Sequence, residues 1–175
     1  MNERVLYLMV CGAGPADHVD VAIGLAQDRG WSVHCVATPA AVEHFLEPAA
    51  VEQLTGHAVR TGYQRQGQPP LPKADAVVVA PATYNTINKW AAGIADTYVL
   101  TQLAELTGLG VPIAVLPFVN TALAANPVLH RSIDVLRSSG VQVLFGKGGF
   151  QPHPPRTGSR AMATYPWSAA LDAVE

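Results

Sequence analysis

The residues best suited to holding a ligand lie in the stretch 81–96. This stretch follows an apolar run, residues 76–80, which is typical of a buried strand. Thr83, Asn85 and Thr86 then bring hydroxyl groups, an amide and free backbone N–H groups to the start of a helix. Such a helix start can hold an anion or the polar edge of a ring. Because ligands bind at the carboxyl ends of strands in an open α/β sheet, we expect a binding site here.

A glycine-rich turn, Gly12-Ala13-Gly14, follows the first apolar run of the chain. Its spacing is similar to the first part of a dinucleotide-binding fingerprint, but Asp17 occupies the position of the third glycine. A carboxylate there would repel a pyrophosphate, so the sequence argues against an NAD site. Two interpretations remain for the turn: its backbone N–H groups bind a single phosphate, or it is a tight turn without a ligand.

Thr38 follows the second apolar run and directly precedes Pro39, which is typical of a helix N-cap before a proline at the first helical position. Its hydroxyl either caps that helix or binds a phosphate near the first loop. Together with the glycine turn, Thr38 favours a mononucleotide phosphate held by Gly12–Gly14 and Thr38. Another polar segment, residues 117–127, follows a later apolar run. Four strand ends with small or polar groups therefore form one edge of a site.

The elements that position these residues alternate between strands and helices. Strands are expected at 5–10, 31–37, 76–80, 111–116 and 141–144, and helices at 18–29, from 39 onward, and at 86–92, 96–106 and 127–138. This order predicts an α/β fold with a doubly wound parallel sheet in a single three-layer domain. Residues 1–146 form the expected domain. Residues 147–175 begin with a Gly- and Pro-rich segment, which predicts a flexible tail or a flap over a site, followed by a short terminal helix.

Composition excludes several classes of function. The net charge of the 175-residue chain is −2, and no stripe of Lys and Arg suggests a nucleic-acid partner. No apolar stretch approaches the roughly 20 residues of a transmembrane helix, and no signal peptide is recognised, so we expect a cytoplasmic protein without a membrane partner. Cys11 and Cys35 lack metal-binding spacing and are expected to pack as free thiols. No metal site is expected.

The motifs resemble those of one family, the homo-oligomeric flavin-containing cysteine decarboxylases. Residues 81–96 resemble the family's Pro-Ala-Ser-Ala-Asn-Thr motif and its continuation, and residues 117–127 resemble its Pro-Ala-Met-Asn motif. The segment from Thr38 to Gly56 also fits the family. The family includes phosphopantothenoylcysteine decarboxylase and the peptide cysteine decarboxylases of lanthipeptide biosynthesis.

The resemblance implies a flavodoxin-like subunit that assembles as a homotrimer or a dodecamer, with FMN bound between subunits. It implies a small-molecule or peptide substrate, whose thiol the flavin oxidises so that the resulting thioaldehyde loses CO2 as an enethiol. Asn120 occupies the place of the family's substrate-binding asparagine. The residues expected to bind FMN are Gly12, Ala13, Gly14, Thr38, Thr83, Tyr84, Asn85, Thr86 and Phe118.

Several residues depart from the family's pattern. The family carries a histidine about eight residues before the aspartate that precedes the third strand, but residues 67–73 contain none. His57 is the nearest histidine and is a weak candidate for that catalytic role, which otherwise has no assigned residue. Tyr84 replaces a small residue, and Phe118 with Val119 replaces Ala-Met. The C-terminal segment lacks the cysteine that the pantothenate-pathway enzymes use there.

Three functions therefore remain open. The chain is an FMN-dependent decarboxylase acting on a cysteine-containing small molecule or peptide C-terminus, or it is an FMN-binding protein with other redox chemistry. The third possibility is a non-catalytic regulatory subunit on the same scaffold. A test of FMN binding distinguishes the regulatory subunit from the decarboxylase and from the protein with other redox chemistry. A flavin prenyltransferase is disfavoured, because that related family has a basic residue where Phe118 stands.

Overall fold

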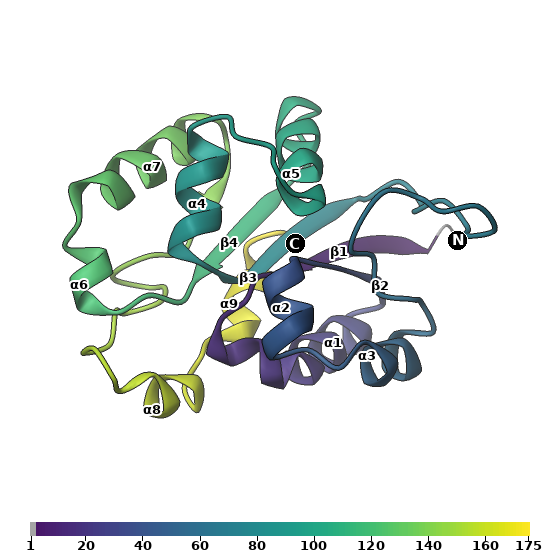
Figure 1. Ribbon diagram of the computed structural model, residues 1–175, viewed down its shortest axis with the longest axis horizontal. Coiled ribbons are helices and arrows are strands. Elements are labelled where there is room, and N and C mark those ends of the chain that lie inside the picture. Colours follow the sequence, from purple (N-terminus) through teal and green to yellow (C-terminus); the bar gives the residue numbers. More distant parts are fainter. Residues whose placement is uncertain (1–2) are drawn as a thin grey trace.

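Five parallel strands form the sheet of the computed structural model, which describes residues 3–175 (Figure 1). The strands are β1 (Arg4–Val10), β2 (Trp31–Ala37), β3 (Ala76–Ala82), β4 (Ile113–Pro117) and β5 (Gln142–Val143). Their order across the sheet is β2-β1-β3-β4-β5, and every paired neighbour runs parallel. The chain therefore places β2 on one side of β1 and then adds β3, β4 and β5 on the other side, as in flavodoxin-like folds. This confirms the doubly wound, flavodoxin-like α/β fold.

Helices cover both faces of the sheet. They are the 3-10 turn η1 (Gly14–His18), α1 (Val19–Asp28), α2 (Pro39–His44), α3 (Pro48–Thr55), α4 (Tyr84–Ala91), α5 (Tyr98–Gly108), α6 (Thr121–Ala124), α7 (Pro127–Ser138), α8 (Gly158–Met162) and α9 (Trp167–Asp172). In Figure 1, α1, α3 and α9 lie on one side of the sheet, and α4, α5 and α7 lie on the other. All seven residues of β3 are buried between these layers, which explains its continuous apolar pattern.

Local sequence signals account for most element boundaries, and prolines account for two differences. The helix expected from residue 18 is preceded by η1, which has Pro15 in its first turn, and α1 begins at Val19. The helix expected after Thr38 is two helices, because Pro48 opens α3 after the end of α2. No signal predicted α8 within the Gly- and Pro-rich segment. None of the helices in residues 3–175 has the length and apolar character needed to cross a membrane.

The end of the chain packs into the core. Helix α9 contacts α1, β3 and β4, and it buries Trp167, Ala170 and Leu171. Just before it, the Tyr165 hydroxyl donates a hydrogen bond of 2.5 Å to the backbone oxygen of Leu116 in β4. Burial raises the pKa of the Tyr165 hydroxyl well above its ordinary value, so this hydroxyl stays a donor. The last turns of the chain therefore belong to the layer that supports β4.

Replacing Trp167 by alanine is expected to lower the free energy of unfolding by about 3–5 kcal/mol, because it empties a large buried site. Urea denaturation followed by circular dichroism measures the change. Leu109→Ala is the matched control, because Leu109 is 70% exposed and its truncation is expected to cost less than about 0.5 kcal/mol. Equal stability of the two variants would contradict the packing of α9 on the sheet.

Candidate functional site

A cavity of about 320 Å³ opens at the carboxyl ends of β1, β2 and β3. Its volume lies within the range of small-molecule sites. The residues that line it are Gly12, Thr38, Pro39, Ala40, Thr83, Asn85, Thr86, Thr97 and Leu100. We call this the strand-end cavity. It brings together five of the residues expected to bind a cofactor, from three segments far apart in the sequence.

Backbone hydrogen bonds between neighbouring strand ends fix the floor of the strand-end cavity. The N–H of Cys11 donates to the oxygen of Pro81 at 3.0 Å, so the turn after β1 is attached to the end of β3. On the other side, the N–H of Thr38 donates to the oxygen of Val10 at 3.0 Å. The three segments that follow β1, β2 and β3 are therefore held in one row, as expected for parallel strands of one sheet.

Three threonine N-caps face the strand-end cavity. The hydroxyl oxygen of Thr38 accepts from the N–H of Ala41 at 3.2 Å, and Thr83 accepts from the N–H of Thr86 at 3.2 Å. Thr97, at the start of α5, accepts from Leu100 at 3.3 Å. A hydroxyl that accepts from the backbone keeps its own hydrogen for another acceptor. The capping and ligand-binding interpretations of Thr38 are therefore compatible.

Among the described residues that line the strand-end cavity, none has a charged side chain. Its polarity comes from hydroxyl groups, the Asn85 amide and the N-terminal ends of α4 and α5, whose dipoles favour a negative group. Cys11 lies behind Thr83 and Thr86, and burial raises the pKa of its thiol even though hydrogen bonds from Thr86 and Thr83 oppose the shift. Cys11 is therefore a neutral buried thiol and not a nucleophile.

Thr97 was not among the residues expected from the sequence. It reaches the strand-end cavity because the connection from α4 to α5 turns sharply at Gly93, whose φ angle is +73°, and returns beside α4. Lys89 on α4 forms an ion pair with Asp96 at 2.5 Å, which holds the connection between α4 and α5 close to α4. A threonine directly before the apolar run of a helix is an N-cap signal, and it would have marked Thr97.

Four other expected cofactor residues do not line the strand-end cavity within one subunit. Ala13 and Gly14 begin η1, and a Cβ atom placed on Gly14 would lie 2.6 Å from the sulfur of Met162 in α8. Tyr84 is the half-buried first residue of α4 and packs against the core. Phe118 follows β4, and its N–H donates to the oxygen of Ala82 at 2.9 Å, which places it beside the end of β3.

Phe118 lies in an aromatic cluster with the C-terminal segment. Its ring centroid is 4.9 Å from that of His153, 5.4 Å from that of Phe150 and 5.8 Å from that of Tyr165. Asn120 lies two residues further along and pairs with His153 through a parallel bridge, and the N–H of Thr121 donates to the oxygen of His153 at 2.8 Å. The C-terminal segment therefore covers the end of β4, where the expected substrate-binding residue lies.

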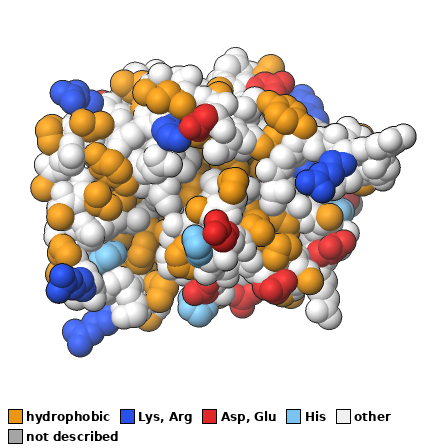
Figure 2. All heavy atoms as spheres, viewed as in Figure 1, with side chains coloured by type: hydrophobic (Ala, Val, Ile, Leu, Met, Phe, Trp, Pro, Cys, Tyr) orange, Lys and Arg blue, Asp and Glu red, His pale blue; other side chains and the backbone are white. Residues whose placement is uncertain are grey.

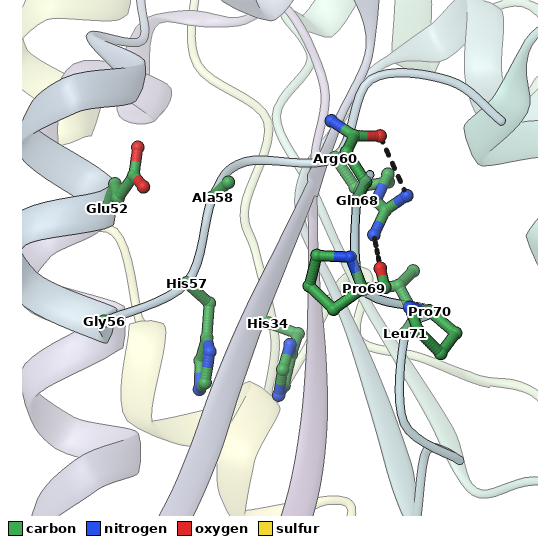
Figure 3. Close-up of a pocket in the computed structure, with 10 residues that line it drawn as sticks. All are labelled: His34, Glu52, Gly56, His57, Ala58, Arg60, Gln68, Pro69, Pro70 and Leu71. Atoms are coloured by element: carbon green, nitrogen blue, oxygen red, sulfur yellow. Dashed lines mark hydrogen bonds between the residues drawn. The ribbon is translucent and has the colours of Figure 1, made fainter. Parts of the chain in front are cut away.

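His57 lies elsewhere. It lines a second cavity, of about 260 Å³, whose lining residues differ from those of the strand-end cavity: His34, Glu52, Gly56, His57, Ala58, Arg60, Gln68, Pro69, Pro70 and Leu71 (Figure 3). Its ring stacks on that of His34, with centroids 3.9 Å apart and planes 16° apart. Within one subunit, the structure does not bring His57 to the strand-end cavity.

The stacked pair makes stability depend on pH. Burial, and secondarily the charge of His57, lowers the pKa of His34 from 6.5 to about 4. The unfolded chain therefore binds a proton at His34 that the folded protein excludes between pH 6.5 and about 4. This contribution to stability is complete above pH 6.5 and is lost as the pH falls through that window.

Between pH 7 and pH 4.5, the free energy of unfolding of the wild type is expected to fall by about 2 kcal/mol more than that of His34→Gln. Urea denaturation of both proteins at the two pH values measures this difference. His44→Gln, at an exposed position on α2, is the control and should follow the wild type. If His34→Gln loses as much stability as the wild type, His34 is protonated normally in the folded state.

Comparison with known proteins gives a consistent set of relatives. Residues 2–166 match the family described as Flavoprotein. The chain is 29% identical over 147 residues to the coenzyme A biosynthesis bifunctional protein CoaBC of Bacillus subtilis. The aligned region covers 80% of this chain and 35% of that protein. It is also 29% identical over 118 residues to the probable phosphopantothenoylcysteine decarboxylase of Streptococcus mutans. Here the aligned region covers 63% of this chain and 65% of the relative. The chain thus spans about a third of the length of the bifunctional relatives.

Solved structures show the same fold. The FMN-dependent cysteine decarboxylase SpaF aligns with a TM-score of 0.70 and 26% identity, covering 98% of this chain and 97% of that one. The FMN-binding protein AtHal3 aligns with a TM-score of 0.70 at 22% identity, covering 93% of this chain and 95% of that one. Because the identity to AtHal3 is only 22%, that similarity establishes the fold alone.

Proposed function

Because the chain belongs to the Flavoprotein family, we propose that it binds FMN in the strand-end cavity and catalyses the oxidative decarboxylation of a cysteine-containing small molecule or peptide C-terminus. The observation that carries this proposal is the convergence of Gly12, Thr38, Thr83, Asn85 and Thr86 on one cavity. The cavity lies at the carboxyl edge of the sheet, beside the β1/β3 switch point, where flavodoxin-like folds bind FMN.

The residues of the strand-end cavity fit FMN in shape and chemistry. Gly12 leaves room next to α2, because a Cβ atom on Gly12 would lie 2.9 Å from the Cβ atom of Ala40. Thr38 and the turn at Gly12 supply donors for the phosphate, and Thr83, Asn85 and Thr86 supply donors and acceptors for the polar edge of the ring. Bound FMN would supply the electron acceptor that a thiol oxidation needs.

The relatives support a substrate that carries cysteine. SpaF is described as an FMN-dependent cysteine decarboxylase, and the Streptococcus mutans relative as a probable phosphopantothenoylcysteine decarboxylase. We propose that Asn120 binds the substrate carboxylate. Its side-chain oxygen accepts from the N–H of Leu123 at 2.9 Å, which leaves the amide NH2 group free to donate. The Gly- and Pro-rich part of residues 147–175, which precedes α9, acts as a flap that covers this substrate site.

We also propose a homotrimer or dodecamer with FMN between subunits. Apolar side chains gather on the surface over α6 and α7, at the left of the view in Figure 2. Leu123, Val128 and Val135 from α6 and α7 are between 38% and 46% exposed, as is Ile94 after α4. Such a patch is typical of a protein interface. Light scattering coupled to size-exclusion chromatography tests the assembly, and a monomer at micromolar concentration would contradict it.

The visible spectrum of the purified protein, with and without added FMN, is the first test of function. We expect a bound-flavin spectrum, and anaerobic incubation with a cysteine-ended peptide should bleach the flavin and release CO2. A protein that takes up no FMN overturns the proposal and leaves the non-catalytic regulatory subunit. A protein that binds FMN but stays oxidised with every thiol tried supports a different redox function.

A further inference from the structure

We propose that His153 is the general base of the substrate site, which accepts the thiol proton of the cysteine through its Nε2 atom. This inference rests on the proposed function and adds a catalytic residue to it. In the step, the S–H bond breaks, its electron pair stays on sulfur as the thiolate, and the proton forms a bond with the lone pair of Nε2. Histidine is the side chain that most often takes a proton in this way near neutral pH.

The position of His153 supports this role. The parallel bridge makes Asn120 and His153 direct neighbours across two extended segments. The His153 ring also packs against Phe118, two residues before Asn120, with ring centroids 4.9 Å apart. The imidazole therefore lies beside the segment that carries Asn120, at the end of β4.

The hydrogen bonds of His153 fix which ring nitrogen is free. Its Nδ1 atom lies 3.0 Å from the backbone oxygen of Pro154. Because a carbonyl oxygen only accepts hydrogen bonds, the ring proton must be on Nδ1, which donates to Pro154. The neutral ring then has its lone pair on Nε2. No hydrogen bond to that nitrogen is found within residues 3–175.

A short turn holds the Pro154 carbonyl in place. The N–H of Thr157 donates to this oxygen at 3.2 Å, and the Thr157 hydroxyl donates to it at 2.7 Å. Gly158 follows at the start of α8 and lies against the ring: a Cβ atom placed there would be 3.5 Å from Cε1 and 3.7 Å from Nε2 of His153. The ring is therefore set in one orientation by its acceptor, by Phe118 and by α8.

The two polar groups complement the two ends of a cysteine. The Asn120 amide donates to a carboxylate, and the Nε2 lone pair of His153 accepts from a thiol. A C-terminal cysteine carries both groups on adjacent carbon atoms, so one substrate residue can meet both partners. A serine-ended peptide has the same shape, but its hydroxyl is a far weaker acid.

The first test examines the ring itself and needs no flavin. In nitrogen-15 NMR spectra of the FMN-free protein, assigned with the His153→Asn variant, we expect the His153 proton on Nδ1 and a bare Nε2. A cysteine-ended peptide should perturb the Nε2 signal more than a serine-ended one. A proton resident on Nε2, or equal responses to both peptides, would overturn the proposal.

The second test measures the proton transfer in the reaction. His153→Asn keeps an N–H donor for Pro154 but lacks the base, so anaerobic reduction of bound FMN by a cysteine-ended peptide should slow by about 10²–10⁴-fold. The peptide dissociation constant of the flavin-free protein should rise by no more than about tenfold, because the variant loses one hydrogen bond to the thiol. His44→Asn, an exposed histidine on α2, should react like the wild type.

The outcomes separate the two proposals. If the wild type reduces its FMN and His153→Asn reduces it equally fast, only the role of His153 is overturned. If the wild type binds no FMN, the proposed function fails, and the NMR result alone decides whether Nε2 is the free, thiol-sensitive nitrogen.

Discussion

Replacing Gly12 by alanine is expected to weaken FMN binding by about 100-fold, which corresponds to about 2.7 kcal/mol. The new methyl carbon would lie 2.9 Å from the Cβ atom and 3.0 Å from the carbonyl carbon of Ala40, closer than packed carbon atoms approach. Both residues line the strand-end cavity, so relief of this contact must shift the turn after β1 or the start of α2. Overpacking of this kind also lowers stability by about 1–3 kcal/mol.

Gly24→Ala is the matched control for Gly12→Ala. Gly24 lies within α1, and a Cβ atom there would meet nothing within 4 Å. Alanine should therefore stabilise the helix by about 0.5–1 kcal/mol and leave FMN affinity unchanged. Quenching of flavin fluorescence on binding measures the affinity, and urea denaturation measures stability. If Gly12→Ala is folded and binds FMN as tightly as Gly24→Ala, the flavin binds outside the strand-end cavity.

The cavity residues contributed by β1, β2 and β3 could be predicted from sequence for a physical reason. Once a chain alternates parallel strands and helices, the carboxyl ends of its strands must meet at one edge. Gly12, Thr38 and Thr83 each lie within two residues of the end of an apolar strand, so their meeting needs no knowledge of side-chain packing. Thr97 instead depends on how the turn at Gly93 and the Lys89–Asp96 pair direct α5, which strand order does not encode.

The positions of the two histidines could not be predicted from the sequence. His57 is near the missing family histidine in sequence, but Gly56 ends α3 with a φ angle of +74° and directs the next residues toward β2, where His57 stacks on His34. His153 lies in the Gly- and Pro-rich segment, for which the sequence leaves a flexible tail and a flap over a site as alternatives. Its neighbours Phe118 and Asn120 are more than 30 positions away, so only the folded chain reveals the contact.

Replacing Asn120 by aspartate is expected to lower kcat/KM for a cysteine-ended substrate by about 10²–10³-fold, because like charges placed together across a binding site cost several kcal/mol. The substitution keeps the size of the side chain and an oxygen for the N–H of Leu123, which Asn120 accepts at 2.9 Å. Aspartate caps helices about as well as asparagine, so the start of α6 should be preserved. What changes is the NH2 donor, which becomes an oxygen that repels the substrate carboxylate.

Asn126→Asp separates this effect from capping. Asn126 is the N-cap of α7 and accepts from the N–H of Val128 at 3.0 Å, so the two substitutions make the same change at two helix starts. Both variants should bind FMN like the wild type, but only Asn120→Asp should lose turnover, and the loss should be smaller for a cysteine amide, which has no carboxylate to repel. If Asn120→Asp loses its FMN instead, Asn120 contacts the cofactor and the assignment to the substrate is wrong. If it keeps full turnover with the acid, the carboxylate binds elsewhere, because an aspartate at the site cannot hold it.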